Sequence, residues 1–207
     1  MKQELDLRLY LVTEESCLQH GVTLMDAVEK ALQAGVTLVQ YREKGGAGGM
    51  MFEKAKALTE LCHRYHVPLL VDDRLDVALA AGADGVHLGQ DDLPCAAARR
   101  IAGPDFLIGV SAHNAEEAAR AEADGADYLG CGAVFPTQTK KGVKPTGINH
   151  LRSIRAAVRI PFVGIGGIQL EHYKAIRATG ADGVAVVTAI LGADDIAAAT
   201  EKFVKQF

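Results

Sequence analysis

A short polar segment after the second apolar run of the sequence, Gln40-Tyr41-Arg42-Glu43-Lys44, holds a guanidinium and an ammonium group two residues apart. If the preceding strand continues its alternation, Gln40, Arg42 and Lys44 point to the same side. Two cations placed in this way suit a pyrophosphate, Arg42 through its planar fork and Lys44 as a point charge. A solvated loop in which Arg42 pairs with Glu43 is an equally good interpretation.

Acidic residues follow the next two apolar runs. Asp72 and Asp73 come after the first of these runs, and Asp91 and Asp92 come after the second. Neighbouring strands would place these loops side by side, so that Asp73 and Asp92 could bind one Mg²⁺ that also accepts phosphate oxygens from a substrate. Each aspartate could instead cap the helix expected after it. Two acidic clusters on adjacent loops favour the metal.

Hydroxyl, imidazole and amine groups follow the fifth and sixth apolar runs. Ser111 could donate to a ligand or cap the next helix, and His113 could act as an acid or base, although a surface histidine is the commoner outcome. Residues 136–142 hold two hydroxyl and two ammonium groups behind a proline, which suits an anion, with Lys140 the better candidate to reach inward. The same composition is also common in surface loops.

The seventh apolar run ends in glycines, at positions Gly164, Gly166 and Gly167. The eighth apolar run ends at Val187 and Thr188. Barrels of parallel strands often bind phosphate between these last two loops, where glycine amides and a helix N-terminus face the anion. The glycine pattern indicates a phosphate site because it ends the seventh predicted strand, whereas a lone G-x-G-G elsewhere would indicate little. A phosphate site is therefore predicted here.

The order of the apolar runs supplies the scaffold that would bring these segments together. Apolar run, polar loop and helical stretch alternate along the chain, which is typical of a parallel sheet. The eight predicted strands are Leu9–Val12, Leu38–Tyr41, Leu69–Val71, Gly85–Leu88, Leu107–Val110, Tyr128–Cys131, Phe162–Ile165 and Gly183–Val187. Eight strands close a barrel, and the loops after them meet at one mouth. The predicted fold class is α/β, with one (β/α)8 TIM barrel domain over residues 1–207.

A short repeat is expected to mark the opposite end of the barrel. Gly-Ala-Asp occurs at residues 82–84, 125–127 and 180–182, each time between an alanine-rich helical stretch and an apolar run, and residues 35–37 form a looser copy. Glycine suits the position after a helix, where positive φ is wanted. The glycine-rich residues 45–49 lie on the other face, as a lid or as a simple surface loop.

Composition limits the other possibilities. The 207 residues are 49% hydrophobic and carry a formal net charge of −4, so one core is expected, with no general attraction for nucleic acid or anionic lipid. No apolar stretch approaches the roughly 20 residues of a membrane span, and the N-terminus does not resemble a signal peptide, which predicts a cytoplasmic protein. The four separated cysteines are expected to be free thiols. Self-association into a homo-oligomer is compatible with such a barrel.

Taken in order, these segments resemble those of the thiamine phosphate synthases. The match covers almost the whole chain, and its motifs are individually modest but specific as an ordered set. They are Gln40-x-Arg42-x-Lys44, the acidic residue of Asp72-Asp73-Arg74, Gly89-Gln90-x-Asp92, Gly109-Val110-Ser111, Pro136-Thr137-x-Thr139-Lys140, Gly164-Ile165-Gly166-Gly167 and the Thr188 loop.

The resemblance implies a transferase that joins a hydroxymethylpyrimidine diphosphate to a thiazole phosphate, or to its carboxylated precursor, with release of pyrophosphate. A pyrimidine-stabilised methylene cation forms and the thiazole nitrogen captures it, so no protein nucleophile is needed. Asp73 and Asp92 would bind the Mg²⁺ cofactor, and Arg42, Lys44 and Lys140 would be catalytic. The residues expected around the two small-molecule substrates are Gln40, Tyr41, Arg42, Glu43, Lys44, Asp72, Ser111, Thr137, Gln138, Thr139, Lys140, Gly167, Val187 and Thr188.

Asp72 departs from the family pattern, which usually has an asparagine that contacts the pyrimidine and its amino group. Three other functions stay open. One is an isomerase like the thiazole tautomerases, which use a histidine near the position of His113; the others are a different phosphate-sugar barrel enzyme and a catalytically silent metabolite sensor. The paired aspartates, together with Lys44 and Lys140, favour the synthase.

Overall fold

Eight parallel strands form a closed barrel in the order β1 to β8 in the computed structural model, which describes residues 5–137, 139 and 144–207. The strands are β1 (Leu9–Val12), β2 (Leu38–Tyr41), β3 (Leu69–Asp72), β4 (Gly85–Leu88), β5 (Leu107–Ala112), β6 (Tyr128–Gly132), β7 (Phe162–Ile165) and β8 (Gly183–Val186). The predicted strands and the single (β/α)8 barrel are confirmed, and the strand bounds that differ do so by one or two residues.

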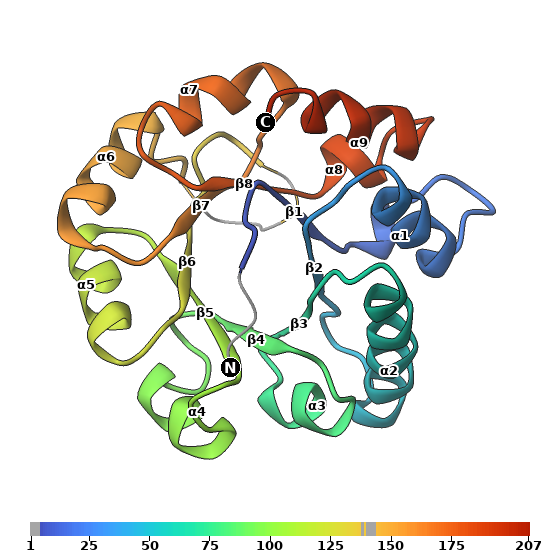
Figure 1. Cartoon of the computed structure of the whole chain (residues 1–207), viewed down its shortest axis with the longest axis horizontal. Coiled ribbons are helices and arrows are strands. Elements are labelled where there is room, and N and C mark those ends of the chain that lie inside the picture. Colours follow the sequence, from blue (N-terminus) through green and yellow to red (C-terminus); the bar gives the residue numbers. More distant parts are fainter. Residues whose placement is uncertain (1–4, 138, 140–143) are drawn as a thin grey trace.

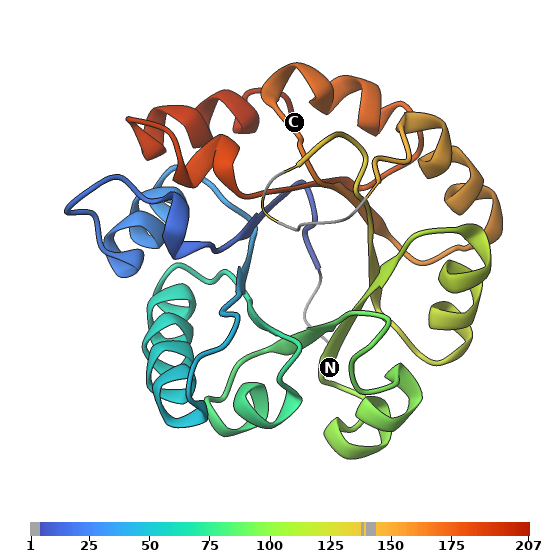
Figure 2. The same ribbon diagram turned by 180° about the vertical axis from the view of Figure 1, so that it is seen from behind.

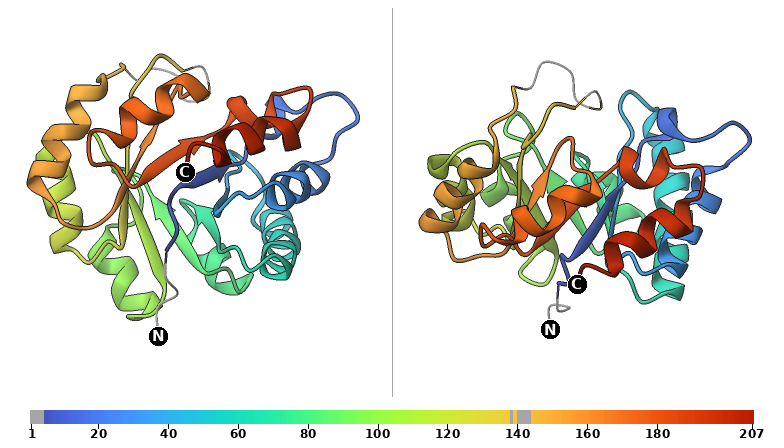
Figure 3. Two further views of the ribbon diagram at one scale, coloured as in Figure 1. Left: turned by 45° about the horizontal axis from the view of Figure 1, so that its top comes forward. Right: turned by 90° about the horizontal axis from the view of Figure 1, so that it is seen from above.

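Helices surround the barrel in the described part of the chain (Figure 1). They are η1 (Glu15–Cys17), α1 (Leu24–Gln33), α2 (Gly48–Arg64), α3 (Leu75–Ala80), α4 (Cys95–Ala102), α5 (Ala115–Ala123), α6 (Ile148–Ala157), η2 (Leu170–His172), α7 (Tyr173–Arg177), α8 (Thr188–Leu191) and α9 (Ile196–Val204). Viewed from behind, the connection after β6, in yellow, partly overlies the barrel opening (Figure 2). Side views place this connection at the end of the barrel opposite the one where the chain enters β1 (Figure 3).

Two apolar layers hold the barrel together. Because both faces of a parallel sheet are covered, each strand buries alternate residues inside the barrel and against the helices. The inner layer includes Tyr10, Leu38, Leu70, Leu107 and Tyr128, and the larger outer layer fills the space between strands and helices. Among the described residues, no helix combines the length and apolarity that crossing a bilayer requires. The four cysteines are free thiols, as predicted.

The Gly-Ala-Asp repeat closes the end of the barrel away from the strand C-termini. Its glycines have φ of 67°, 92° and 90° in chain order, which confirms the predicted helix ends. The aspartates accept backbone N–H groups of the preceding strand: Asp84 from Leu69 and Asp127 from Ile108, both at 2.8 Å, and Asp182 from Phe162 at 3.0 Å. Each repeat therefore ends a helix and ties two neighbouring strands together.

His66 stands at the position after α2 where glycine would be favoured, with φ of 58°. The bonds from Val67 N–H to Cys62 O and from His66 N–H to His63 O, both 3.1 Å, close the helix in the usual Schellman pattern. We expect His66→Gly to raise the free energy of unfolding by about 0.5–1 kcal/mol, because glycine has no Cβ to strain there. Urea denaturation checks this, with His66→Ala as the control that keeps the strain. Equal stability of the two variants would contradict it.

Candidate active site

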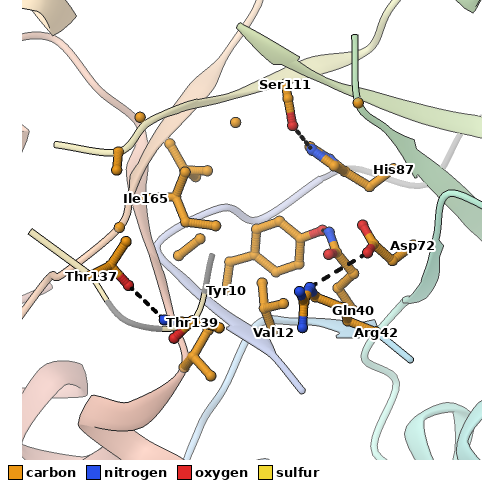
Figure 4. Close-up of a pocket in the computed structure, with 18 of the residues that line it drawn as sticks. Tyr10, Val12, Gln40, Arg42, Asp72, His87, Ser111, Thr137, Thr139 and Ile165 are labelled. Atoms are coloured by element: carbon orange, nitrogen blue, oxygen red, sulfur yellow. Dashed lines mark hydrogen bonds and ion pairs between the residues drawn. The ribbon is translucent and has the colours of Figure 1, made fainter. Parts of the chain in front are cut away.

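A cavity of about 350 Å³ opens at the carboxyl ends of the strands. This size falls within the usual range for small-molecule sites. Segments that are far apart in the sequence meet around it, and Figure 4 shows several of their side chains pointing inward. Of the residues predicted for the site, those that line the cavity are Gln40, Arg42, Lys44, Asp72, Asp73, Asp92, Ser111, Thr137, Thr139, Gly167, Val187 and Thr188. Gln138 and Lys140 lie outside the described residues.

Tyr41 and Glu43 do not line the cavity, although both were expected near the substrates. Strand alternation explains this: Tyr41 belongs to the outer apolar layer and its hydroxyl donates to Glu43 at 3.1 Å. Glu43 in turn accepts from Lys54 of α2 at 2.9 Å. Glu43 therefore pairs with Lys54, and not with Arg42 as the alternative interpretation expected.

Carboxylates hold both cations of the β2 loop. Arg42 Nη1 lies 2.5 Å from Glu14 Oε2, and Arg42 Nε lies 3.7 Å from Asp72 Oδ2. Lys44 Nζ lies 2.9 Å from Asp72 Oδ2 and also contacts Asp73. Glu14 was not singled out from the sequence, although an acidic residue shortly after the first predicted strand was a signal that it could reach the mouth. The two cations are therefore fixed at one rim of the cavity.

Asp72 and Asp73 are consecutive residues that both line the cavity. Successive side chains of an extended strand would point to opposite faces. Asp72 is the last residue of β3, and Asp73 has φ of 61°, in the left-handed region that aspartate tolerates better than most residues. This change of backbone conformation lets two neighbouring carboxylates face the same space.

Asp73 and Asp92 form a donor set that suits a divalent cation. Burial and the neighbouring Asp73 raise the pKa of Asp92, whose Oδ2 also accepts the Gly89 N–H at 2.7 Å. Burial opposes ionisation of Asp73, but contact with Lys44 and Asp92 brings its pKa below the usual value. No group of three or more potential ligands occurs among the described residues. A two-carboxylate set nevertheless fits Mg²⁺, which keeps several waters and takes phosphate oxygens.

Asp72 is a buried carboxyl whose charged form is unfavourable. Burial and the adjacent Asp73 raise its pKa to about 6, although Lys44 and Arg42 oppose the shift. A carboxyl with a raised pKa in the fold contributes stability at low pH that is lost as the pH rises through about 6. At pH 8 the ionised Asp72 therefore destabilises the protein relative to a neutral side chain of the same shape.

We expect Asp72→Asn to raise the free energy of unfolding at pH 8 by about 1–3 kcal/mol, and the gain to disappear below about pH 4. Turnover should stay within about tenfold of the parent, a change of ~1.4 kcal/mol or less in the barrier. Denaturant titrations at the two pH values, with Asp76→Asn as an exposed control, measure the first effect. Destabilisation at pH 8 would show that the ion pairs outweigh burial, and complete loss of activity would assign the carboxylate another role.

Close backbone packing builds the opposite rim. Gly166 and Gly167 have φ of 96° and 63°. A Cβ at Gly167 would lie 2.3 Å from Pro136 O, and one at Gly166 would lie 2.6 Å from Ala133 Cβ. The glycines thus let the loop after β7 pack against the loop after β6. This brings Thr137 and Thr139, whose N–H donates to Thr137 Oγ1 at 3.3 Å, to the same cavity as Val187 and Thr188 (Figure 4).

A chain of hydrogen bonds crosses the floor of the cavity, and the sequence interpretation missed most of it. Gln40 Nε2 donates to the Tyr10 hydroxyl at 2.5 Å, and the Tyr10 and Tyr128 hydroxyls are 2.8 Å apart. Tyr128 lies 2.8 Å from His87 Nδ1, and His87 Nε2 lies 3.0 Å from Ser111 Oγ. Inward register on the predicted strands was the available signal for Tyr10, His87 and Tyr128.

A closed (β/α)8 barrel with charged and hydroxyl groups gathered at the carboxyl ends of its strands defines the class of TIM-barrel enzymes. The family model described as "Thiamine monophosphate synthase" matches residues 9–190. The chain therefore belongs to the thiamine monophosphate synthase family, and it is an enzyme of the transferase class.

Relatives named as thiamine-phosphate synthases match this chain over nearly their whole length. The thiamine-phosphate synthase of Chloroflexus aurantiacus is 50% identical over 198 residues, which cover 95% of this chain and 91% of the relative. That of Pyrococcus horikoshii is 48% identical over 195 residues, covering 94% and 92%. The solved structure of thiamine phosphate pyrophosphorylase from Pyrococcus furiosus aligns with a TM-score of 0.89 at 42% identity and covers 97% and 95% of the two chains.

Other solved structures share the fold alone. The 3-hexulose-6-phosphate synthase structure has a TM-score of 0.68 at 21% identity, and the alignment covers 95% of this chain and 98% of that one. Such similarity extends the barrel architecture to enzymes of other chemistry and carries no functional conclusion for this chain.

Proposed function

We propose that this chain joins 4-amino-2-methyl-5-hydroxymethylpyrimidine diphosphate to 4-methyl-5-(2-hydroxyethyl)thiazole phosphate, giving thiamine phosphate and pyrophosphate in a dissociative, Mg²⁺-assisted substitution. One observation carries the proposal. Arg42 and Lys44 share a cavity with the carboxylates of Asp73 and Asp92, and Gly167 lines the same cavity from another loop. Two phosphorylated substrates need two anion-binding regions around one reaction space, and this arrangement supplies them.

The first region would hold the leaving diphosphate. The bond between the pyrimidine methylene carbon and the diphosphate oxygen breaks, and its electron pair leaves with pyrophosphate. Arg42 and Lys44 would stabilise the growing negative charge more strongly in the transition state than in the ground state, which is the condition for acceleration. When bound by Asp73 and Asp92, Mg²⁺ would neutralise part of the same charge. Lys140 is proposed for the same task.

The second region would hold the thiazole phosphate between the loops after β6, β7 and β8. Thr137, Thr139 and Thr188 offer hydroxyl groups there, and Gly167 lines the same part of the cavity. The thiazole nitrogen then bonds to the pyrimidine methylene cation, so no protein atom becomes covalently attached. Apolar side chains such as Val163 and Ile165 also line the cavity and would shield this cation from water.

Incubation of the purified protein with both substrates and Mg²⁺ tests the proposal. We expect thiamine phosphate, separated by chromatography, to appear in amounts equal to the pyrophosphate released. Isomerisation of a thiazole carboxylate without pyrophosphate release would instead favour the tautomerase alternative. Binding of both substrates without any product would favour the metabolite sensor.

A further inference from the structure

We infer that Tyr10, Tyr128 and His87 form a directional hydrogen-bond relay that aims the hydroxyl proton of Ser111 into the cavity, toward a diphosphate oxygen. These three side chains are positioning residues, because they act through Ser111. The inference rests on the proposed function for the identity of the anion, and the relay itself is defined by contacts within the chain.

The relay is continuous and joins five strands. It begins at Gln40 on β2 and passes through Tyr10 on β1 to Tyr128 on β6, with hydrogen bonds of 2.5 and 2.8 Å. From there it reaches His87 on β4 at 2.8 Å and Ser111 on β5 at 3.0 Å. Figure 4 shows the Tyr10 ring in the middle of the cavity floor, with its hydroxyl beside the Gln40 amide and His87 directed at Ser111.

We assign the direction of the relay from its first bond together with the rule that each buried hydroxyl donates its one proton. The Gln40 amide nitrogen donates to the Tyr10 hydroxyl, and in the direction that we assign Tyr10 donates in turn to Tyr128, so that each buried hydroxyl accepts one proton and donates its own. Tyr128 then donates to His87 Nδ1, which must be unprotonated. A neutral imidazole carries its remaining proton on the other nitrogen, so Nε2–H donates to Ser111 Oγ. The Ser111 proton is left to donate to a ligand oxygen.

Burial keeps both phenols of the relay in their protonated form. Tyr10 is 1% exposed and Tyr128 is fully buried, and loss of solvation raises the pKa of both phenols well above the usual value. Both hydroxyls therefore stay protonated at neutral pH and remain able to donate. The rings also pack edge to face, with centroids 5.8 Å apart, which limits alternative orientations.

Two glycines make room for these side chains. A Cβ at Gly109 would lie 2.3 Å from the Tyr128 hydroxyl, and a Cβ at Gly130 would lie 3.0 Å from His87 Cε1. Neither glycine is described with positive φ, so backbone conformation does not require them. The side chains of the relay need the space that a Cβ would fill. This need explains why glycine stands at position 109, two residues before Ser111.

The opposite direction would have the opposite effect on Ser111. If His87 carried its proton on Nδ1, its Nε2 would accept the Ser111 proton and draw it away from the cavity. Ser111 Oγ would then present only lone pairs to a negatively charged ligand. The Tyr128 hydroxyl thereby decides whether Ser111 is a donor or an acceptor toward the diphosphate.

Nitrogen NMR of the full-length protein labelled with ¹⁵N-histidine tests the direction. We expect the Nδ1 of His87 to resonate as an unprotonated nitrogen and its Nε2 as a protonated one, with the signals assigned from their loss in His87→Gln. Tyr128→Phe should shift this population toward the other tautomer. An Nδ1-protonated or doubly protonated His87 in the parent protein would overturn the relay, whether or not any variant folds.

A double-mutant cycle on binding of inorganic pyrophosphate with Mg²⁺, measured by calorimetry, tests the link to Ser111. We expect Ser111→Ala and Tyr128→Phe each to weaken binding about tenfold, the usual worth of a hydrogen bond to a charged group, and the double variant to bind no more weakly than Ser111→Ala alone. Tyr65→Phe is the matched control, because its hydroxyl also makes two hydrogen bonds, with Glu29 and Gln33, outside the barrel.

Additive losses in the double variant would mean that Tyr128 supports the fold without acting through Ser111, and would overturn the inference. The outcome is separable from the proposed function. Coupled losses of pyrophosphate affinity in a protein that makes no thiamine phosphate would retain the relay and reject the synthase reaction. Formation of thiamine phosphate together with additive losses would support the synthase reaction and reject the relay.

Discussion

Asp92→Asn is expected to lower turnover by about 10²- to 10³-fold while affinity for thiazole phosphate stays within about twofold. The asparagine oxygen can still accept the Gly89 N–H that Asp92 accepts at 2.7 Å, so the loop should keep its conformation. What is lost is one of the two carboxylate charges proposed for Mg²⁺. The thiazole phosphate is proposed to bind at the opposite rim, and its binding does not depend on that charge.

Steady-state kinetics over a range of Mg²⁺ concentrations, with calorimetry for thiazole phosphate, measure both quantities. Excess Mg²⁺ should restore part of the activity, since the remaining Asp73 would bind the ion more weakly. Asp76→Asn provides the control, because it removes the same charge from an exposed aspartate that does not line the cavity and should change turnover less than threefold. Asp92→Ala should be at least as inactive as Asp92→Asn. Undiminished turnover in either variant would remove Asp92 from the metal site.

Arg42→Gln is expected to reduce turnover by about 10²- to 10³-fold with little change in the KM for thiazole phosphate. Its side chain is 16% exposed and its guanidinium is held by Glu14 and Asp72, so it is already oriented before a substrate arrives. A group that is fixed in advance stabilises developing charge without a further cost of reorganisation. Arg42→Lys should recover only part of the activity, because lysine keeps the charge but lacks the planar fork.

Measurements of kcat and KM with each substrate varied in turn distinguish this role from general destabilisation. Arg152→Gln changes the same residue type at an exposed position of α6 that does not line the cavity, and it should leave both constants unchanged. A fall confined to the KM for the pyrimidine diphosphate, with kcat unaltered, would show that Arg42 binds the ground state and transition state equally. That result would remove it from the residues that accelerate the reaction.

Ion pairs within the chain hold the cationic rim. Lys44 contacts both Asp72 and Asp73, and Arg42 contacts Glu14 and Asp72. A diphosphate would therefore compete with Asp72 and Asp73 for Lys44, while Glu14 continues to orient Arg42. Asp72 adds one carboxylate to this competition. We attribute the tolerance expected of Asp72→Asn to its releasing Lys44 and Arg42 for the substrate.

The barrel could be predicted from the sequence because its signals are local. Each apolar run is short, a helical stretch separates it from the next, and the Gly-Ala-Asp repeat marks where helices end. The repeat's glycines do have positive φ, for example 67° at Gly82. Since parallel strands present their carboxyl ends on one side, Arg42, Asp73 and Asp92 could be placed together before any coordinates were known, and they line one cavity.

The remaining features depend on contacts across the barrel, which no local pattern contains. Tyr10 and Tyr128 lie in apolar runs and look like ordinary core residues, yet 118 positions of sequence separate two hydroxyls that are hydrogen-bonded. The resemblance also placed Tyr41 and Glu43 near the substrates, whereas Tyr41 belongs to the outer apolar layer and neither residue lines the cavity. Glu14, which pairs with Arg42, lies on a different loop, and its place after the first predicted strand showed that it could reach the mouth but not which side chain it would contact.

The decisive measurement is a crystal structure of the protein soaked with Mn²⁺ and inorganic pyrophosphate, in which anomalous scattering locates the ion. We predict one strong peak bound by the carboxylates of Asp73 and Asp92, with pyrophosphate oxygens completing its coordination and Arg42 and Lys44 in contact with the same pyrophosphate. An ion bound elsewhere, or a pyrophosphate held only by the loops after β7 and β8, would contradict the proposal that these four side chains grip the leaving group together.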